Sequence, residues 1–115
     1  MTEEKRGSVH VSPGVVATLA RLTAEAVPGV ARVGAGGRGP LRFLPRILPD
    51  RLTHATGVKA QISPDGVRLE LTLIVQQGAS MLEVASRVQR EVGEAVEKTV
   101  GLPVREVNVR IQDVQ

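Results

Sequence analysis

The sequence predicts a single α+β domain in which two helices cover one face of a mixed β-sheet, a two-layer sandwich with the element order β-α-β-β-α-β. Its 115 residues suit one hydrophobic core. Two segments carry apolar residues at three- and four-residue spacing, and several others alternate apolar with polar residues. Because each element has only one apolar side, two packed layers satisfy all of them. The order also favours a ferredoxin-like topology.

The first strand and helix are predicted from the beginning of the domain, which we expect to span residues 8–115 after a flexible N-terminus at residues 1–7. Val9 and Val11 alternate with a polar residue, and Ser12 and a following proline are typical of a helix start. The expected apolar stripe of this helix is Val15, Val16, Leu19, Leu22, Ala26 and Val27. A Pro-Gly pair ends the helix, and a short strand is expected at residues 30–33.

A β-hairpin and a second helix are predicted after residue 57. Apolar residues recur at every second position on both sides of a Ser-Pro-Asp-Gly turn at residues 63–66. Ser80 and Glu83 form a capping box, and Gly101 is placed to end the helix. Its expected apolar stripe is Leu82, Ala85, Val88, Val92, Ala95, Val96 and Thr99. The last strand alternates apolar Val107, Val109 and Ile111 with polar Glu106, Asn108, Arg110 and Gln112.

Composition and charge exclude several classes of protein. The chain has no Cys, so disulfides and thiolate metal sites are excluded, and Phe43 is its single aromatic residue. The first eight residues lack the apolar core of a signal peptide, and no apolar run approaches the roughly 20 residues that cross a bilayer. We therefore expect a cytoplasmic protein. Residues 1–60 carry a net charge of +5 and residues 61–115 one of −2, so the basic excess lies in the first half.

Four segments together resemble one known family: VHVSPGVVATLARLTAEAVPGV, GVKAQISPDGVRLELTLIV, EVASRVQREVGEAVEKTVGLPV and EVNVRIQDV. The chain is similar, over residues 8–33 and 57–114, to the bacterial alkaline-shock-protein family of envelope-stress proteins, also called the Gls-type general-stress family. The resemblance implies a small non-enzymatic protein that lies beneath the cytoplasmic membrane through a membrane-anchored partner and self-associates. It supplies no catalytic residues.

The irregular basic arm at residues 34–56 departs from the family pattern, which has a variable Gly-rich linker there. Its leucines can fold back on the domain, contact a partner or a second copy, or insert beside anionic lipid. We expect it to bind the membrane-anchored partner or a neighbouring copy. The candidate residues are Arg38, Arg42, Phe43, Leu44, Arg46, Ile47 and Arg51.

The polar face of the sheet is a second candidate surface, because a free face or edge strand is where copies of an assembling protein can join. Lys59 is also expected to pair with Glu70 across two strands of this face. The candidate self-association residues are Arg68, Glu70, Ile74, Asn108 and Arg110.

Residues capable of chemistry do not form a recognisable set. His10 and His54 have no metal-ligand spacing with another ligand, and the three helix-start and turn serines, Ser12, Ser63 and Ser80, are accounted for by those structures. The sequence predicts no enzyme, no cofactor, no metal and no small-molecule substrate. The alternative function is a small RNA-binding module that uses the GAGG sequence at residues 34–37 and the basic arm. No aromatic platform for base stacking accompanies that sequence, so nucleic-acid binding is not our expectation.

Overall fold

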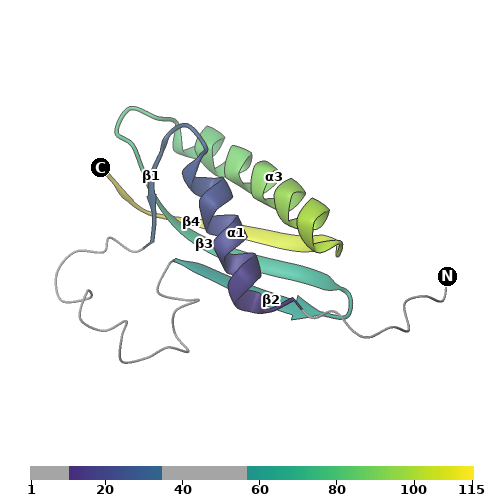
Figure 1. The fold of residues 1–115 in the computed structure, drawn as a ribbon. Helices are drawn as coiled ribbons and strands as arrows, with labels where there is room; N and C mark the ends of the chain where they lie inside the picture. The colour runs from purple at the N-terminus through teal and green to yellow at the C-terminus, as the bar shows by residue number, and fades with distance from the viewer. Residues whose placement is uncertain (1–10, 35–56) are drawn as a thin grey trace, which may run out of the picture.

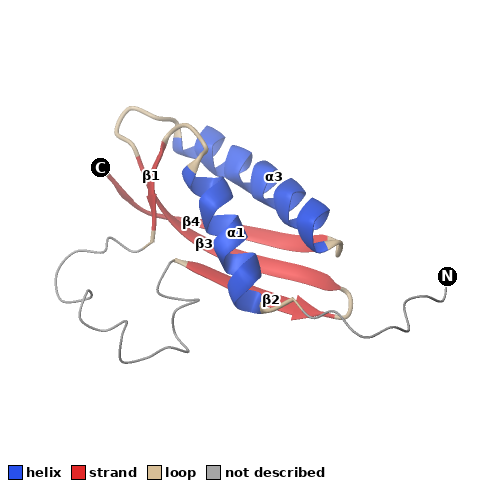
Figure 2. Ribbon diagram, in the orientation of Figure 1, coloured by secondary structure: helices blue, strands red, loops and turns tan. Residues whose placement is uncertain are grey.

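The computed structural model describes residues 11–34 and 57–115, and within them two helices lie side by side on one face of a four-stranded sheet (Figures 1 and 2). This confirms the predicted α+β class and its two layers. The elements are α1 (Pro13–Glu25), β1 (Val30–Val33), β2 (Val58–Ser63), β3 (Gly66–Val75), α3 (Met81–Val100) and β4 (Val104–Val114).

The element order in the described residues is α-β-β-β-α-β and not the predicted β-α-β-β-α-β. Val9 and His10 of the predicted first strand lie outside the described residues, and Val11 is not in a strand. Val11 instead packs against the core directly before the helix cap Ser12. An apolar residue before an N-cap commonly makes such a contact, and beside another valine it imitates the alternation of a strand.

The sheet is mixed, as expected, but its topology is not ferredoxin-like. β3 lies in the middle, with β4 parallel to it on one edge and β1 and β2 antiparallel to it on the other. In a split β-α-β unit another strand separates the two parallel strands. Here β3 and β4 pair directly from Val67 opposite Val104 to Val75 opposite Val114, with α3 as their crossover.

The predicted helix starts and the predicted end of α3 are confirmed by their caps, whereas α1 ends at Glu25 and not at the predicted Pro-Gly pair. The Ser12 Oγ accepts a hydrogen bond from the Val15 N–H (3.2 Å), and Pro13 occupies the first turn. The Ser80 Oγ accepts one from the Glu83 N–H (3.3 Å). Gly101 ends α3 in the left-handed conformation, with φ of 87°, which favours glycine.

The buried face of α1 differs from the predicted stripe. Val16 and Val27 are buried as predicted, but Val15 and Leu22 are 58% and 54% exposed. The helix instead buries three alanines outside the predicted stripe: Ala17, Ala20 and Ala24. Both stripes have helical spacing, so periodicity alone does not choose between them. The small alanines allow α1 to approach β1, β2 and α3 closely, and this packing sets the helix rotation.

The buried face of α3 is also rotated from the prediction at its start. Its core row is Val84, Val88, Val92 and Val96, spaced four residues apart. Leu82, which the prediction placed in the core, is 77% exposed. The core row belongs to the same hydrophobic cluster as Leu69, Leu71 and Leu73 of β3, which have almost no exposed surface. One hydrophobic core therefore lies between the helices and the sheet.

Candidate interaction surface

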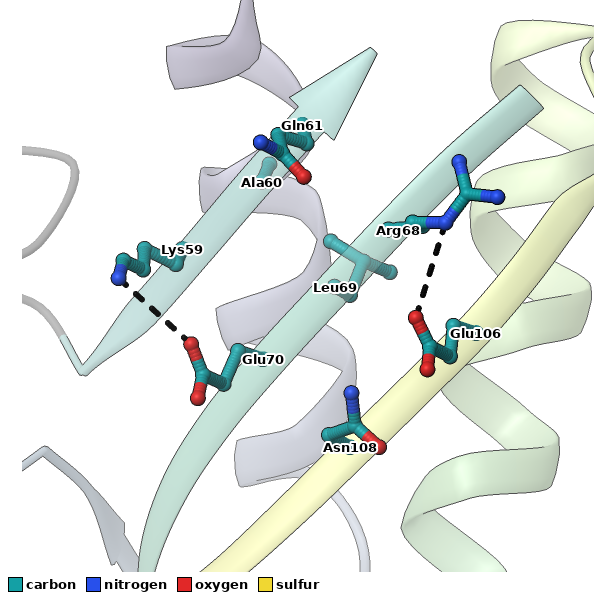
Figure 3. A pocket seen from close by; sticks show the side chains of 8 residues that line it. All are labelled: Lys59, Ala60, Gln61, Arg68, Leu69, Glu70, Glu106 and Asn108. Carbon is teal, nitrogen blue, oxygen red and sulfur yellow. Dashed lines mark ion pairs between the residues drawn. The ribbon is translucent and has the colours of Figure 1, made fainter. Parts of the chain in front are cut away.

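The face of the sheet turned away from the helices is polar, and it brings together most of the residues predicted for self-association. Arg68, Glu70 and Asn108 line a shallow depression of about 260 Å³ on this face (Figure 3). Arg110 lies on the same face and lines a neighbouring depression with Glu70. Register explains the grouping, because Arg68 pairs with Glu106 and Glu70 with Asn108 across β3 and β4.

Ion pairs cross this face in short steps. The Lys59 Nζ lies 3.7 Å from the Glu70 Oε1, which confirms the predicted cross-strand pair (Figure 3). Glu70 also lies 4.0 Å from Arg110, and the Arg68 Nε lies 3.7 Å from the Glu106 Oε1. Such exposed pairs each contribute about 0–1 kcal/mol to stability. The signs alternate from strand to strand, so the face has no large region of one charge.

The hairpin turn holds the most strongly perturbed titratable group of the described residues. Asp65 accepts hydrogen bonds from the Arg68 guanidinium (3.2 and 3.3 Å) and from the Ser63 hydroxyl (2.6 Å). These bonds lower the pKa of Asp65 to about 2, and the same contact with Asp65 raises the pKa of Arg68. The Arg105 Nε donates to the Asp65 carbonyl (2.7 Å). These contacts connect the hairpin turn to β4, so Asp65 has a structural role.

Ile74 is the exception among the predicted self-association residues, because it is only 3% exposed. The β3–β4 register shifts between Leu73 and Ile74, and Ile74 lies between Arg32 on β1 and Asp113 on β4. Leu73 and Val75 belong to the hydrophobic core cluster and Ile74 does not, so alternation places Ile74 on the outer face as predicted, where its neighbours on the two adjacent strands cover it. Ile74 is therefore not available as a contact on the open face.

The outer edge of β4 carries contacts that the sequence analysis did not anticipate. The Gln89 Nε2 donates to the Val107 carbonyl (3.0 Å), and the Glu97 Oε2 accepts from the Val104 N–H (3.3 Å). Further along, the Asp113 Oδ1 accepts from the Val114 N–H (2.8 Å). Gln89 and Glu97 are eight residues apart on α3 and both lie on its β4 side. The sequence contains this spacing, but it does not show that β4 packs against that side of the helix.

Large apolar side chains are exposed on both helices. Val15 and Leu22 are seven residues apart and form, with the half-buried Leu19, a stripe on α1. Leu82 and the neighbouring Met81, which is 49% exposed, lie at the start of α3. Val15, Leu22 and Leu82 were predicted to lie in the core, because their spacing is that of an apolar helix face. They are candidate contact residues for other proteins.

The remaining predicted candidates can be placed only in part. All seven arm residues, Arg38, Arg42, Phe43, Leu44, Arg46, Ile47 and Arg51, lie outside the described residues, as do His10, His54 and the last three positions of the GAGG sequence. The three serines occur in the described part as two helix caps and a turn. In residues 11–34 and 57–115, no three His, Cys, Asp or Glu side chains are grouped as a metal ion would need. Neither described helix has the length and apolarity to cross a membrane.

Known proteins similar to this chain include two from Bacillus subtilis. YqhY, an uncharacterized protein, is 28% identical over 95% of this chain and 78% of its own length. YloU, also uncharacterized, is 27% identical over 96% of this chain and 91% of its own length. Among solved structures, a zinc form of a MamM CTD variant is 16% identical with a TM-score of 0.48, covering 85% of this chain and 81% of that one.

The family comparison agrees with the resemblance found in the sequence. The model of the alkaline shock protein 23 family matches residues 1–115. That family is described by a cell envelope-related function. The chain therefore belongs to the alkaline shock protein 23 family of cell envelope-related proteins.

Proposed function

We propose that this protein is a non-catalytic envelope-stress protein that acts by binding other proteins. In this proposal a membrane-anchored partner recruits it to the cytoplasmic face of the membrane, where it also associates with copies of itself. The observation that carries the proposal is a complete core combined with large apolar side chains that no described residue covers, Val15, Leu22 and Leu82 above all. Membership of a cell envelope-related family supports the location.

The exposed α1 stripe supports partner binding by the spacing of its apolar residues. α1 packs over β1 and β2, and the arm joins the end of β1 at Val33 to the start of β2 at Val58. The 15, 19 and 22 positions of α1 have the spacing by which a helix packs against another helix or fills an apolar groove. A helix or an apolar groove of a partner can therefore accept the stripe, and the arm at residues 34–56 is the second proposed contact.

Binding to membrane vesicles tests recruitment. Purified protein is sedimented with inverted native vesicles, with the same vesicles after protease treatment, and with liposomes made from the extracted lipids. We expect binding to intact vesicles only, because the anchor is a protein. Equal binding to the liposomes would instead identify lipid as the ligand, and no binding to any of the three would contradict recruitment.

Two variants separate the candidate contacts in the same assay. Leu22→Glu places a charge in the exposed α1 stripe, and deletion of residues 35–57 removes the arm. We expect each to reduce vesicle binding at least about tenfold, because a buried unpaired charge or a lost contact surface costs about 1.4 kcal/mol or more. Lys98→Glu, at an exposed position in the last turn of α3, is the control. A salt-dependent gel shift with RNA would favour the RNA-binding alternative.

A further inference from the structure

The outer edge of β4 is covered at both ends and open in the middle. Gln89 and Glu97 bond to the Val107 carbonyl and the Val104 N–H, and Asp113 bonds to the Val114 N–H. The backbone N–H and C=O of one residue in a strand point to the same edge, and those of the next residue point to the opposite edge. The N–H and C=O of Val109 and Ile111 therefore point outward, like the Val107 carbonyl. No strand within residues 11–34 and 57–115 pairs with them. A row of unpaired peptide groups in a long edge strand is a template for another strand.

The charged residues of β4 are complementary to those of a second copy of β4 that runs in the opposite direction. On the open face of the sheet, Glu106 and Arg110 lie at equal distances on either side of Asn108. In an antiparallel pair centred on Asn108, each Glu106 therefore faces Arg110 of the second copy. Glu106 already neighbours Arg68 and Arg110 neighbours Glu70. The alternation of charge within one sheet would continue without a break into the next.

We infer that the outer edge of β4 pairs antiparallel with the outer edge of β4 in a second copy, about a two-fold axis at Asn108. The inference deepens the proposed self-association and rests on it. Val107 of one copy stands opposite Val109 of the other, and their peptide groups exchange hydrogen bonds. The Val107 carbonyl keeps its bond from Gln89, because a carbonyl oxygen can accept two. The two sheets become one continuous sheet.

In this arrangement the exposed Leu82 also lies at the contact between the two copies. Leu82 and Gln89 are seven residues apart on α3 and therefore share its β4 side. Glu97 of α3 bonds at Val104 and Gln89 at Val107, so α3 runs antiparallel to β4 and its earlier residues lie towards the part of β4 after Val107. We infer that Leu82 faces this part of the strand. The two-fold axis brings it opposite the groove of about 380 Å³ between α3 and β4 of the second copy, where Gly93 leaves room beside Val107.

Two charge reversals test this pairing by sedimentation velocity over a range of concentrations. Glu106→Arg places like charges opposite Arg110 of the second copy, and Arg110→Glu does the same opposite Glu106. We expect each variant alone to dimerise at least about tenfold more weakly than the native chain. An equimolar mixture of the two variants should recover the native affinity, because every facing pair then has opposite signs. Lys59→Glu, on the same face but on β2, is the control and should leave the affinity unchanged.

A further variant tests the apolar contact made by Leu82. Leu82→Asp, at a position 77% exposed, should fold normally by far-UV circular dichroism and weaken the dimer. If the native chain associates but neither reversal weakens it, or if mixing restores nothing, the β4 pairing is wrong while self-association stands. If the native chain stays monomeric at every concentration, the pairing and the self-association in the proposed function are both wrong.

Discussion

Gly34 and Gly57 together occupy the place of a single residue opposite Thr72. The Gly34 N–H donates to the Thr72 carbonyl, and the Thr72 N–H donates to the Gly57 carbonyl, both at 2.8 Å. In a regular antiparallel ladder one residue makes both bonds. A Cβ on Gly57 would lie 2.4 Å from the Gly34 Cα, so only glycine permits this approach. β1 and β2 are thus two parts of one strand position along β3, interrupted by the arm.

Deletion of residues 35–57 should therefore leave the fold intact. Gly34 would then precede Val58 directly and supply both bonds to Thr72, and the pairs Val33 with Leu73 and Val58 with Leu71 would be kept. We expect an unchanged far-UV spectrum and a melting temperature within about 5 °C of the native chain. A matched control removes one residue more, 35–58. Because a shift of one residue moves every β2 side chain to the opposite face, that variant should not fold stably.

Leu71→Ala and Leu22→Ala should separate the true core from the predicted one. Leu71 is fully buried in the middle of β3, so its truncation should lower the free energy of unfolding by about 2–5 kcal/mol. Leu22, although predicted in the core, is 54% exposed, so its truncation should change that free energy by no more than about 0.5 kcal/mol. Urea denaturation of both variants measures the difference. Equal losses would mean that α1 is rotated differently from the structure.

Gly29→Ala should destabilise the protein more than Gly78→Ala. Both glycines have positive φ, 98° and 93°, so both substitutions carry a similar backbone cost of about 1 kcal/mol. At Gly29 the added methyl would also lie 2.6 Å from the Val84 Cγ2 in the core, whereas nothing lies within 4 Å at Gly78. Thermal denaturation should give the lower melting temperature for Gly29→Ala, and the reverse order would show that Val84 moves aside without cost.

Asp65 should make stability fall in strongly acidic solution. Its pKa is lowered from 3.8 to about 2 in the folded chain by the hydrogen bonds from Arg68 and Ser63. A group with a lowered folded pKa stabilises the fold above its unfolded pKa, and this contribution is lost as the pH falls from about 4 towards 2. Asp65→Asn should flatten this part of the curve of stability against pH. Asp113→Asn, at an exposed carboxylate near the end of β4, is the comparison.

The parts of the fold that the sequence predicted correctly depend on local chemistry. Ser12 and Ser80 cap their helices, Gly101 ends α3, and the turn at residues 63–66 joins β2 to β3 as expected. These features involve residues within a few positions of one another, so their side chains alone specify them. The polar face of the sheet was also predicted from a local feature, because strict alternation places Arg68 and Glu70 on one side of a strand.

Other features depend on residues that are distant in sequence. The misassigned Val15, Leu22 and Leu82 satisfy the same helical periodicity as the residues that are buried, and only packing against the sheet and the other helix distinguishes them. Ile74 keeps the alternation of its own strand but is covered by residues of β1 and β4, which no pattern within β3 predicts. The edge contact of Gln89 could not be anticipated, because α3 and β4 had first to be placed together.

The sequence by itself determined that this chain forms an α+β domain of the alkaline-shock-protein family with capped helices and a tight hairpin, because periodicity, caps and turn residues act over short distances. Only the tertiary structure decided that β4 lies parallel to β3, that Gly34 meets Gly57, and which helix faces remain exposed. These outcomes follow from the burial of all the apolar surfaces at once, and no single segment contains that information.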